Sequence, residues 1–256
     1  MAEPEEDFNM AKSPEDPKDI FVDIVTDYKT AFGNDLVSIV LYGSAVGKDY
    51  RPGKSDINFM LVLTEKGIER IDAAFDIIKK WRKRNVATPL FLTEAYVATS
   101  LDVFPIEYLN FQKNYVLVFG KDILKDLTFD REHLRLQCER EIKGKLLILR
   151  EAFLETSGKG KALKELIGHS MAAFVAIFEA LLYLKGQELP ATKREVIRAT
   201  AAEFDMDPAL FLKLLDIKEE RAKPGDMETI GLFKDYLREA RKLAKLVDSL
   251  GGQHEQ

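Results

Sequence analysis

The stretch Leu41-Tyr-Gly-Ser-Ala-Val-Gly-Lys-Asp-Tyr-Arg-Pro-Gly-Lys-Ser-Asp-Ile-Asn-Phe-Met-Leu-Val-Leu63 decides the fold of this chain. It continues a short apolar, β-branched run that starts at Leu36, and this pattern predicts a buried strand ending in a glycine-serine turn. A polar loop of about ten residues follows, and a second apolar run opens at Asp56. The pattern therefore predicts two strands joined by a loop that carries polar side chains.

The polar residues at the start of the second run have a spacing suited to a shared task. Asp56 and Asn58 are two residues apart, so on a strand their side chains point to the same face, roughly 6.6–6.8 Å apart. Two carboxylates placed in this way can hold Mg²⁺ ions about 3.5–4 Å apart. Asn58 keeps an oxygen that can bind a hard cation, but it has no negative charge. We therefore expect a divalent site that is weakened in the direction of catalytic loss.

The glycine-serine turn has the chemistry of a phosphate contact. Gly43 lets the backbone come close to a ligand, and Ser44 with the turn that follows offers N–H and hydroxyl donors to phosphate oxygens. The residues Gly43, Ser44, Ser55 and Asp56 together resemble the signature of the DNA polymerase β-like nucleotidyltransferases, of the small nucleotidyltransferase and antibiotic adenylyltransferase type. In that signature Gly-Ser ends one strand and Ser-Asp-x-Asp opens the next. The resemblance covers roughly residues 36–93.

The resemblance implies a function and a set of roles. A member of this family transfers a nucleoside monophosphate from a nucleoside triphosphate, such as ATP, to a hydroxyl of an acceptor with the help of Mg²⁺. Here the acceptor, a small molecule or a protein, is unknown. By the resemblance Asp56 is the catalytic carboxylate and principal metal ligand, and Asn58 is a weak second ligand. The residues implied to hold the triphosphate are Gly43, Ser44 and Ser55. Lys54, in the loop before Ser55, is a candidate to reach the triphosphate as a point charge, and the alternative is a solvated loop.

The lack of a third acid is the second departure from the family pattern. The family needs it on the following strand, but Thr88-Pro-Leu-Phe-Leu-Thr93 has none, and Phe91 or a neighbour takes its expected place. Glu107, in a later strand-like stretch, is the nearest acid and is our candidate for a catalytic role. The alternative is an exposed glutamate on a half-buried strand.

These departures leave two functions open. The first is a Mg²⁺-dependent nucleotidyltransferase. The second is a catalytically degenerate protein of the same fold that binds a nucleotide or a partner as a regulatory or interaction module.

Composition limits the partners. The chain has 256 residues, 46% of them hydrophobic and 32% charged, with a formal net charge of -5, as expected for a soluble globular protein. This acidity argues against a general nucleic-acid binder. The single cysteine, Cys138, falls on an apolar helix face and is predicted to be a core residue in a reducing, cytoplasmic setting. No stretch is expected to be apolar over the roughly 20 residues needed to span a membrane, so no membrane partner is expected. The oligomeric state is open.

The order of patterns predicts an α/β (α+β) nucleotidyltransferase-like domain with a mixed sheet, followed by an all-α helical-bundle domain. The expected boundaries are a flexible acidic tail at 1–17, the first domain at 18–125, the helical domain at 126–250 and a flexible tail at 251–256. The expected helices are 17–32, 66–84, 94–101, 131–155, 161–184, 192–204, 207–215 and 226–250, and the expected strands are 36–42, 56–63, 89–93, 106–111 and 115–119. The helical half resembles the substrate-facing domain of antibiotic-type adenylyltransferases, which closes over a small hydroxylated acceptor.

Other local patterns do not support a further function. Pro52-Gly-Lys-Ser55 imitates the end of a P-loop, but Gly47 stands one residue too far away and a strand follows instead of a helix. The basic run at 79–84 suits a helix C-terminus. His169 has no arginine four to six residues before it, so a ribonuclease signature found in some helical partner modules is not present.

Overall fold

The computed structural model describes residues 13–47 and 50–251, and these form two compact units. The first unit is Met1–Leu101 with Phe111–Thr128, and the second is Asp102–Asn110 with Phe129–Gln256. Most of the two expected tails lies outside the described residues. Pro14, inside the expected N-terminal tail, is buried, and its carbonyl accepts a hydrogen bond of 2.8 Å from the Tyr50 hydroxyl.

The first unit is built on a mixed four-stranded sheet in the order β3-β2-β1-β4. Its strands are β1 (Leu36–Tyr42), β2 (Asn58–Leu63), β3 (Leu90–Thr93) and β4 (Tyr115–Gly120). β1 is antiparallel to β2 and to β4, whereas β2 and β3 are parallel. Parallel neighbours need a crossover connection, and the helical segment between β2 and β3 supplies it. The predicted mixed sheet is confirmed.

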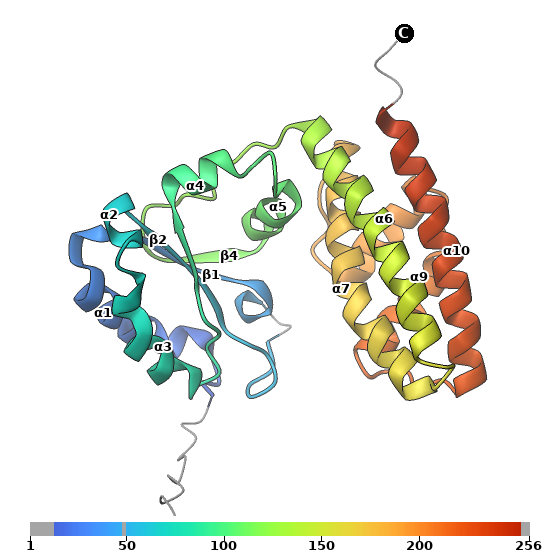
Figure 1. Ribbon diagram of the computed structural model, residues 1–256, viewed down its shortest axis with the longest axis horizontal. Coiled ribbons are helices and arrows are strands. Elements are labelled where there is room, and N and C mark those ends of the chain that lie inside the picture. Colours follow the sequence, from blue (N-terminus) through green and yellow to red (C-terminus); the bar gives the residue numbers. More distant parts are fainter. Residues whose placement is uncertain (1–12, 48–49, 252–256) are drawn as a thin grey trace, which may run out of the picture. The chain divides into compact units, whose positions relative to one another are not determined.

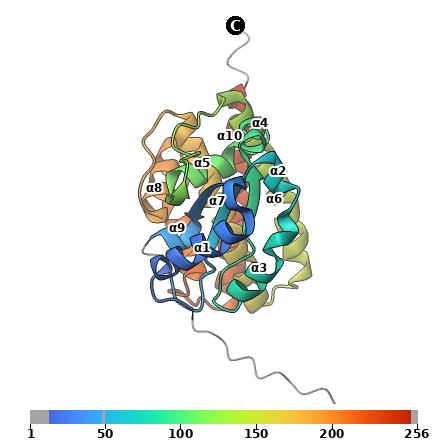
Figure 2. The same cartoon turned by 90° about the vertical axis from the view of Figure 1, so that its left-hand side faces the viewer.

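Helices α1 (Phe21–Phe32) and α3 (Phe75–Arg82) cover one face of this sheet (Figures 1 and 2). Apolar residues at helical spacing on α1 pack against alternate residues of the two central strands: Ile20, Ile24, Tyr28, Phe32, Ile39, Leu41, Phe59, Leu61 and Leu63 are all in one buried cluster. Trp81 of α3 is buried there too, and its indole Nε1 donates to Asp27 of α1 at 2.7 Å. One sheet face is thus committed to the core.

Two expected elements in the first half are wrong. The helix expected at 66–84 is broken into α2 (Glu65–Ile68), a 3-10 turn at Ile71–Ala74 and α3. Thr64 caps α2 through the Gly67 N–H, and a Cβ on Gly67 would lie 2.9 Å from Asp35, so this first turn is held tightly against a neighbouring loop. The strand expected at 106–111 is the helix α5 (Pro105–Lys113). Pro105 opens it, where the fixed φ of proline suits a first helical turn. The short α4 (Glu94–Thr99) is as expected.

Every regular element described in the second unit is helical. After the start of α5 come α6 (Arg131–Glu155), α7 (Gly160–Leu184), α8 (Lys193–Glu203), α9 (Pro208–Lys218) and α10 (Asp226–Gly251). The predicted all-helical second half is therefore confirmed. Cys138 of α6 is fully buried, and burial raises the pKa of its thiol to about 12, which confirms the prediction of a core cysteine.

Helix α7 is the centre of this unit and packs against α6, α8, α9 and α10. It is also the one described helix that is long and apolar enough to cross a membrane by length and composition, so the expectation that no stretch is apolar over that length is wrong. A window of 18 residues has a mean hydropathy of 1.7, and 56% of that window is buried inside the structure. A helix surrounded by others needs apolar residues all round.

The same substitution, glycine to alanine, at two positions tests how closely the fold is packed around each of them. Gly120 has φ +82°, and a Cβ there would lie 2.0 Å from the Val37 carbonyl oxygen. Gly231 lies within α10, with nothing within 4 Å of its Cβ position. We expect Gly120→Ala to lower the free energy of unfolding by more than about 1 kcal/mol and Gly231→Ala to raise it by about 0.5–1 kcal/mol, as measured by urea denaturation. Equal effects would contradict this account.

Candidate functional site

The strand pairing places the Asp56–Asn58 pair beside the glycine turn. Tyr42, the last residue of β1, is the register partner of Asn58, the first residue of β2. A Cβ built on Gly43, the next residue along, would lie 3.5 Å from the Asn58 Nδ2 atom. Ile57 is buried and points to the opposite face, so Asp56 and Asn58 share the face away from α1. The Asn58 side chain therefore lies beside the turn at Gly43.

The turn itself depends on glycine. Gly43 has φ +80°, a conformation that costs a residue with a Cβ about 1–2 kcal/mol. Its carbonyl oxygen accepts a long hydrogen bond of 3.4 Å from the side chain of Asn114. The chain continues as a 3-10 turn, Gly43–Val46, that no side chain caps, and Ser44 in it is half-buried. The turn thus starts without a side-chain cap, next to the side chain of Asn58.

The loop before β2 is held by a compact network. The Ser55 Oγ atom accepts a hydrogen bond of 3.1 Å from the Arg51 N–H, and the Ser55 N–H donates to the Arg51 carbonyl at 2.9 Å. Asn85 donates from Nδ2 to the Ser55 carbonyl at 2.8 Å, and its own carbonyl accepts from Ile57 N–H at 3.0 Å. The Ser55 hydroxyl therefore closes the loop but keeps its hydrogen for a further acceptor.

Sequence reasoning did not identify Asn85 or Asn114 as part of this site. Asn85 has φ 64°, in the left-handed region that asparagine tolerates better than most residues, and its position after the basic run at 79–84 is a weak signal for a turn. Nothing in the sequence places Asn114 beside Gly43, because that contact depends on the pairing of β4 with β1.

The two charged side chains of the site are exposed. Asp56 has no ion-pair or side-chain hydrogen-bond partner among the described residues, and Lys54 likewise has none for its ammonium group. Asn58 is half-buried, and its Nδ2 lies 3.5 Å from the Asp56 carbonyl oxygen, at the limit of a hydrogen bond. Both charges are thus open to a ligand.

The neighbouring strand β3 offers no acid to this face. Leu90 is the register partner of Met60, and Leu92 is the partner of Val62, so these two leucines share the face of Asn58. Of the residues expected in the place of the third acid, Phe91 or a neighbour, the neighbours Leu90 and Leu92 are the ones on this face, since Phe91 points to the core. Its ring contacts Tyr28 and Phe32, with centroids 6.3 and 6.2 Å apart.

Glu107 lies in α5 and belongs to the second unit, whereas Asp56 belongs to the first. The Glu107 carboxylate accepts a hydrogen bond of 2.7 Å from Nε2 of Gln137 on α6. The Oε1 atom of the same buried Gln137 accepts from the Ile106 N–H at 2.7 Å. Glu107 therefore takes part in fastening the start of α5 to α6. Its catalytic role stays a prediction.

Aromatic side chains continue the site along β1 and β4. Tyr42 pairs with Tyr115 across the strands, and its ring meets Phe111 edge-on with centroids 4.8 Å apart. The Tyr115 hydroxyl donates to both carboxylate oxygens of Asp122, at 3.0 and 2.9 Å. Partial burial, followed by Asp122, raises the pKa of Tyr115 to about 12. These phenols are neutral donors at physiological pH.

The oxygen ligands of this site suit one Mg²⁺ ion better than two. No group of three or more Asp, Glu, His or Cys suited to a metal occurs among residues 13–47 and 50–251. One carboxylate and one amide fit a single Mg²⁺ that arrives with a triphosphate, since Mg²⁺ is often held by one or two carboxylates and substrate phosphates. They do not fit two ions bridged by shared carboxylates.

Comparison with known proteins adds a likeness in layout. No family model matches the chain, and no curated protein does. Among solved structures, the chain is similar to spectinomycin adenyltransferase AAD(9) from Enterococcus faecialis, determined with ATP and spectinomycin, with a TM-score of 0.47 and 11% identity over 85% of this chain and 98% of that one. A likeness at this level does not carry a function.

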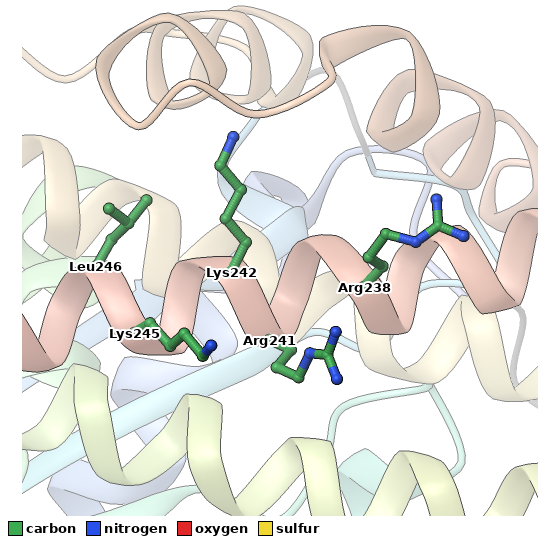
Figure 3. A pocket seen from close by; sticks show the side chains of 5 residues that line it. All are labelled: Arg238, Arg241, Lys242, Lys245 and Leu246. Atoms are coloured by element: carbon green, nitrogen blue, oxygen red, sulfur yellow. The ribbon is translucent and has the colours of Figure 1, made fainter.

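A shallow pocket of about 300 Å³ lies elsewhere, on α10 in the second unit, lined by Arg238, Arg241, Lys242, Lys245 and Leu246 (Figure 3). Figure 3 shows these side chains spreading to both sides of the one helix. Arg238 is paired with Asp235, and Lys242 is paired with Asp205. The positive charge of this pocket makes it a place where anions compete with the Gly43 turn. Because all its cations belong to a single helix, however, we interpret it as a solvated helix face.

The contacts of Glu107 lead to a prediction. Gln137→Leu removes both hydrogen bonds that fasten α5, and we expect it to cost about 1–3 kcal/mol of stability in urea denaturation because a buried N–H loses its partner. Glu107→Gln keeps the size and an acceptor oxygen, so we expect it to leave stability and nucleotide binding nearly unchanged. A stable Glu107→Gln protein with lost metal-dependent turnover would instead identify Glu107 as the third acid.

Proposed function

We propose that the first unit is a nucleotidyltransferase-like module that binds a nucleoside triphosphate through its phosphates at the Gly43–Ser44 turn. The observation that carries this proposal is the 3.5 Å separation between the Asn58 Nδ2 atom and the Cβ position of Gly43. This arrangement places the Asn58 amide, the exposed Asp56 carboxylate and the uncapped turn that starts at Gly43 on one face of the sheet.

The identity of the nearest side-chain atom matters for the ligand. Nδ2 is a hydrogen-bond donor, whereas an aspartate at the same position has only acceptors. Phosphate oxygens need donors, and an uncompensated carboxylate beside them repels them. Asn58 thus favours direct contact with a phosphate. In the family pattern, an aspartate at this position contacts the phosphate through a metal ion instead. Ser44, Ser55 and Lys54 supply further donors.

A second candidate function is transfer of the nucleoside monophosphate to an acceptor hydroxyl. The exposed, unpaired carboxylate of Asp56 favours it, because such a group can hold Mg²⁺ that arrives with the triphosphate. In this case Mg²⁺ would supply charge stabilisation at the phosphates. Asn58 would be a weak second ligand and Glu107 the candidate third acid. The acceptor in this reaction is unidentified, and the chemistry requires only that it bear a hydroxyl.

The two candidates differ in how Asn58→Asp responds to metal. In the absence of Mg²⁺ we expect this variant to bind ATP at least about tenfold more weakly than the native chain, a loss of about 1.4 kcal/mol, because a carboxylate replaces a donor. With Mg²⁺ present we expect the variant to regain affinity and the native chain to change little. Isothermal titration calorimetry with and without EDTA measures both effects.

Asp56→Asn is the matched control, since it neutralises the neighbouring residue without changing the donor at position 58. If native binding of ATP requires Mg²⁺ and Asn58→Asp makes no difference without metal, direct phosphate binding by Asn58 is wrong. Release of pyrophosphate by the native chain with a hydroxylated acceptor, lost in Asp56→Asn, would establish transfer as the function. No binding of ATP at millimolar concentration by any of the three proteins would overturn the proposed site.

A further inference from the structure

Asn85 closes the C-terminal end of helix α3 in a conformation that few residues adopt. Its φ of 64° lies in the left-handed region. The Asn85 N–H donates to the Arg82 carbonyl at 3.2 Å. The next N–H, that of Val86, donates to the Trp81 carbonyl, also at 3.2 Å. These two hydrogen bonds form a Schellman motif, in which the left-handed residue is usually glycine. An asparagine here keeps the backbone of the motif and adds a side chain with a donor.

This end of the helix is fixed to the core of the first unit. Trp81 and Val86 are both buried in the cluster that lies between α1 and the sheet. Val86 also forms a parallel bridge with Ile57, and the Ala87 N–H donates to the Ile57 carbonyl at 3.0 Å. Residue 85 is therefore held between a packed helix and the residues that lead into β2.

Asn85 makes one hydrogen bond on each side of Asp56. Its Nδ2 atom donates to the Ser55 carbonyl at 2.8 Å, and its own carbonyl accepts from the Ile57 N–H at 3.0 Å. The first bond holds the peptide group before Asp56, and the second holds the peptide group after it. The pairing of β2 with β1 ends at Asn58, so it does not reach these groups. Asn85 thus fixes the backbone from which the Asp56 carboxylate projects.

The two hydrogen bonds place different demands on residue 85. The bond to Ile57 comes from the backbone, so it survives any substitution that keeps the left-handed conformation. The bond to the Ser55 carbonyl needs a short side chain with a donor. Glycine tolerates the conformation but has no side chain, and an ionised aspartate has only acceptors. Asparagine therefore combines the two properties that this position uses.

We propose that Asn85 is a positioning residue of the nucleotide site, which holds the peptide group between Ser55 and Asp56 in place before a ligand arrives. This role rests on the proposed function of the site. With that peptide group fixed, the Ser55 hydroxyl and the Asp56 carboxylate lose less conformational freedom when a triphosphate binds. The Nδ2 atom and the carbonyl oxygen of Asn85 are engaged with the protein backbone, so the contribution of these groups is preorganisation.

Asn85→Gly isolates the side chain, because glycine keeps the left-handed backbone and the hydrogen bond to Ile57. In EDTA, we expect this variant to bind ATP about three- to tenfold more weakly than the native chain, the size of one net hydrogen bond. Isothermal titration calorimetry measures the difference. Glu220→Gly is the matched control, because Glu220 also has a positive φ, 59°, but ends α9 in the second unit. It is expected to leave ATP affinity unchanged, and circular dichroism checks that both variants are folded.

A double-mutant cycle with Ser55→Ala separates positioning from a general loosening of the fold. If Asn85 acts through Ser55, Asn85→Gly costs less than about twofold in ATP affinity once the Ser55 hydroxyl is absent. A merely structural role would give the same loss in both backgrounds, and that result overturns the proposal.

The Asp56 backbone amide reports on the same peptide group without a ligand. In ¹⁵N relaxation of the free protein, we expect its order parameter to fall from about 0.85 toward about 0.6 in Asn85→Gly. The order parameter of the Ile57 amide, which the backbone of residue 85 holds, is expected to stay close to its native value. An unchanged Asp56 order parameter overturns the proposal whether or not ATP binds.

The titrations distinguish failure of this role from failure of the proposed function. Equal ATP affinity in the native chain and in Asn85→Gly overturns the positioning role and leaves the proposed function standing. A native chain that binds no ATP overturns both.

Discussion

The antiparallel pairing of β1 with β2 is the constraint on which the candidate site depends. Pairing Tyr42 with Asn58 brings the end of one strand beside the start of the next. The turn that leaves β1 must then stand next to the side chain of residue 58. A slip of one residue in this register would reverse every side chain of β2, sending Asn58 into the core under α1 and Phe59 to the face where Asn58 now lies. The core cluster of α1 with the sheet prevents that slip, so the packing of one face fixes the chemistry of the other.

The sequence predicts those parts of the fold that depend on strong local periodicity. The apolar run of β1 and the long helix α6 are predicted at their observed bounds, β1 because a buried strand reads as a short, continuous β-branched apolar run. The strand predicted at 106–111 is wrong because Ile106, Tyr108 and Leu109 are apolar in a short run, and periodicity in a short run cannot separate strand from helix. Gln137, which holds the start of that helix, is distant in the chain.

The site was predictable to a similar extent. Gly43 and the Asp56–Asn58 pair follow from a spacing that the sequence shows directly. The face on which Phe91 lies could not be read from Thr88 to Thr93, because Leu, Phe and Leu are all apolar and do not reveal the alternation. The supporting contact from Asn114 depends on strand pairing across the sheet. These are tertiary effects that no local pattern records.

Asparagine at position 58 gives this site its individual character. A site with paired carboxylates attracts cations first and binds phosphate through them. With one carboxylate and a donor facing the turn, the balance moves toward binding the anion directly. Since β3 contributes only leucines to this face, no nearby strand restores the missing charge. The physical difference between the two proposed functions therefore comes down to which species, metal or phosphate, contacts residue 58.

Nuclear magnetic resonance of the ¹⁵N-labelled chain during titration with ATP tests this most directly, because it observes the Asn58 side-chain amide itself. The account predicts that the Asn58 side-chain NH₂ resonances and the backbone amides of Gly43 and Ser44 shift together, in EDTA, with one common dissociation constant. Shifts confined to the cationic segment 238–246 of α10, with the Asn58 amide unmoved at saturation, would contradict it.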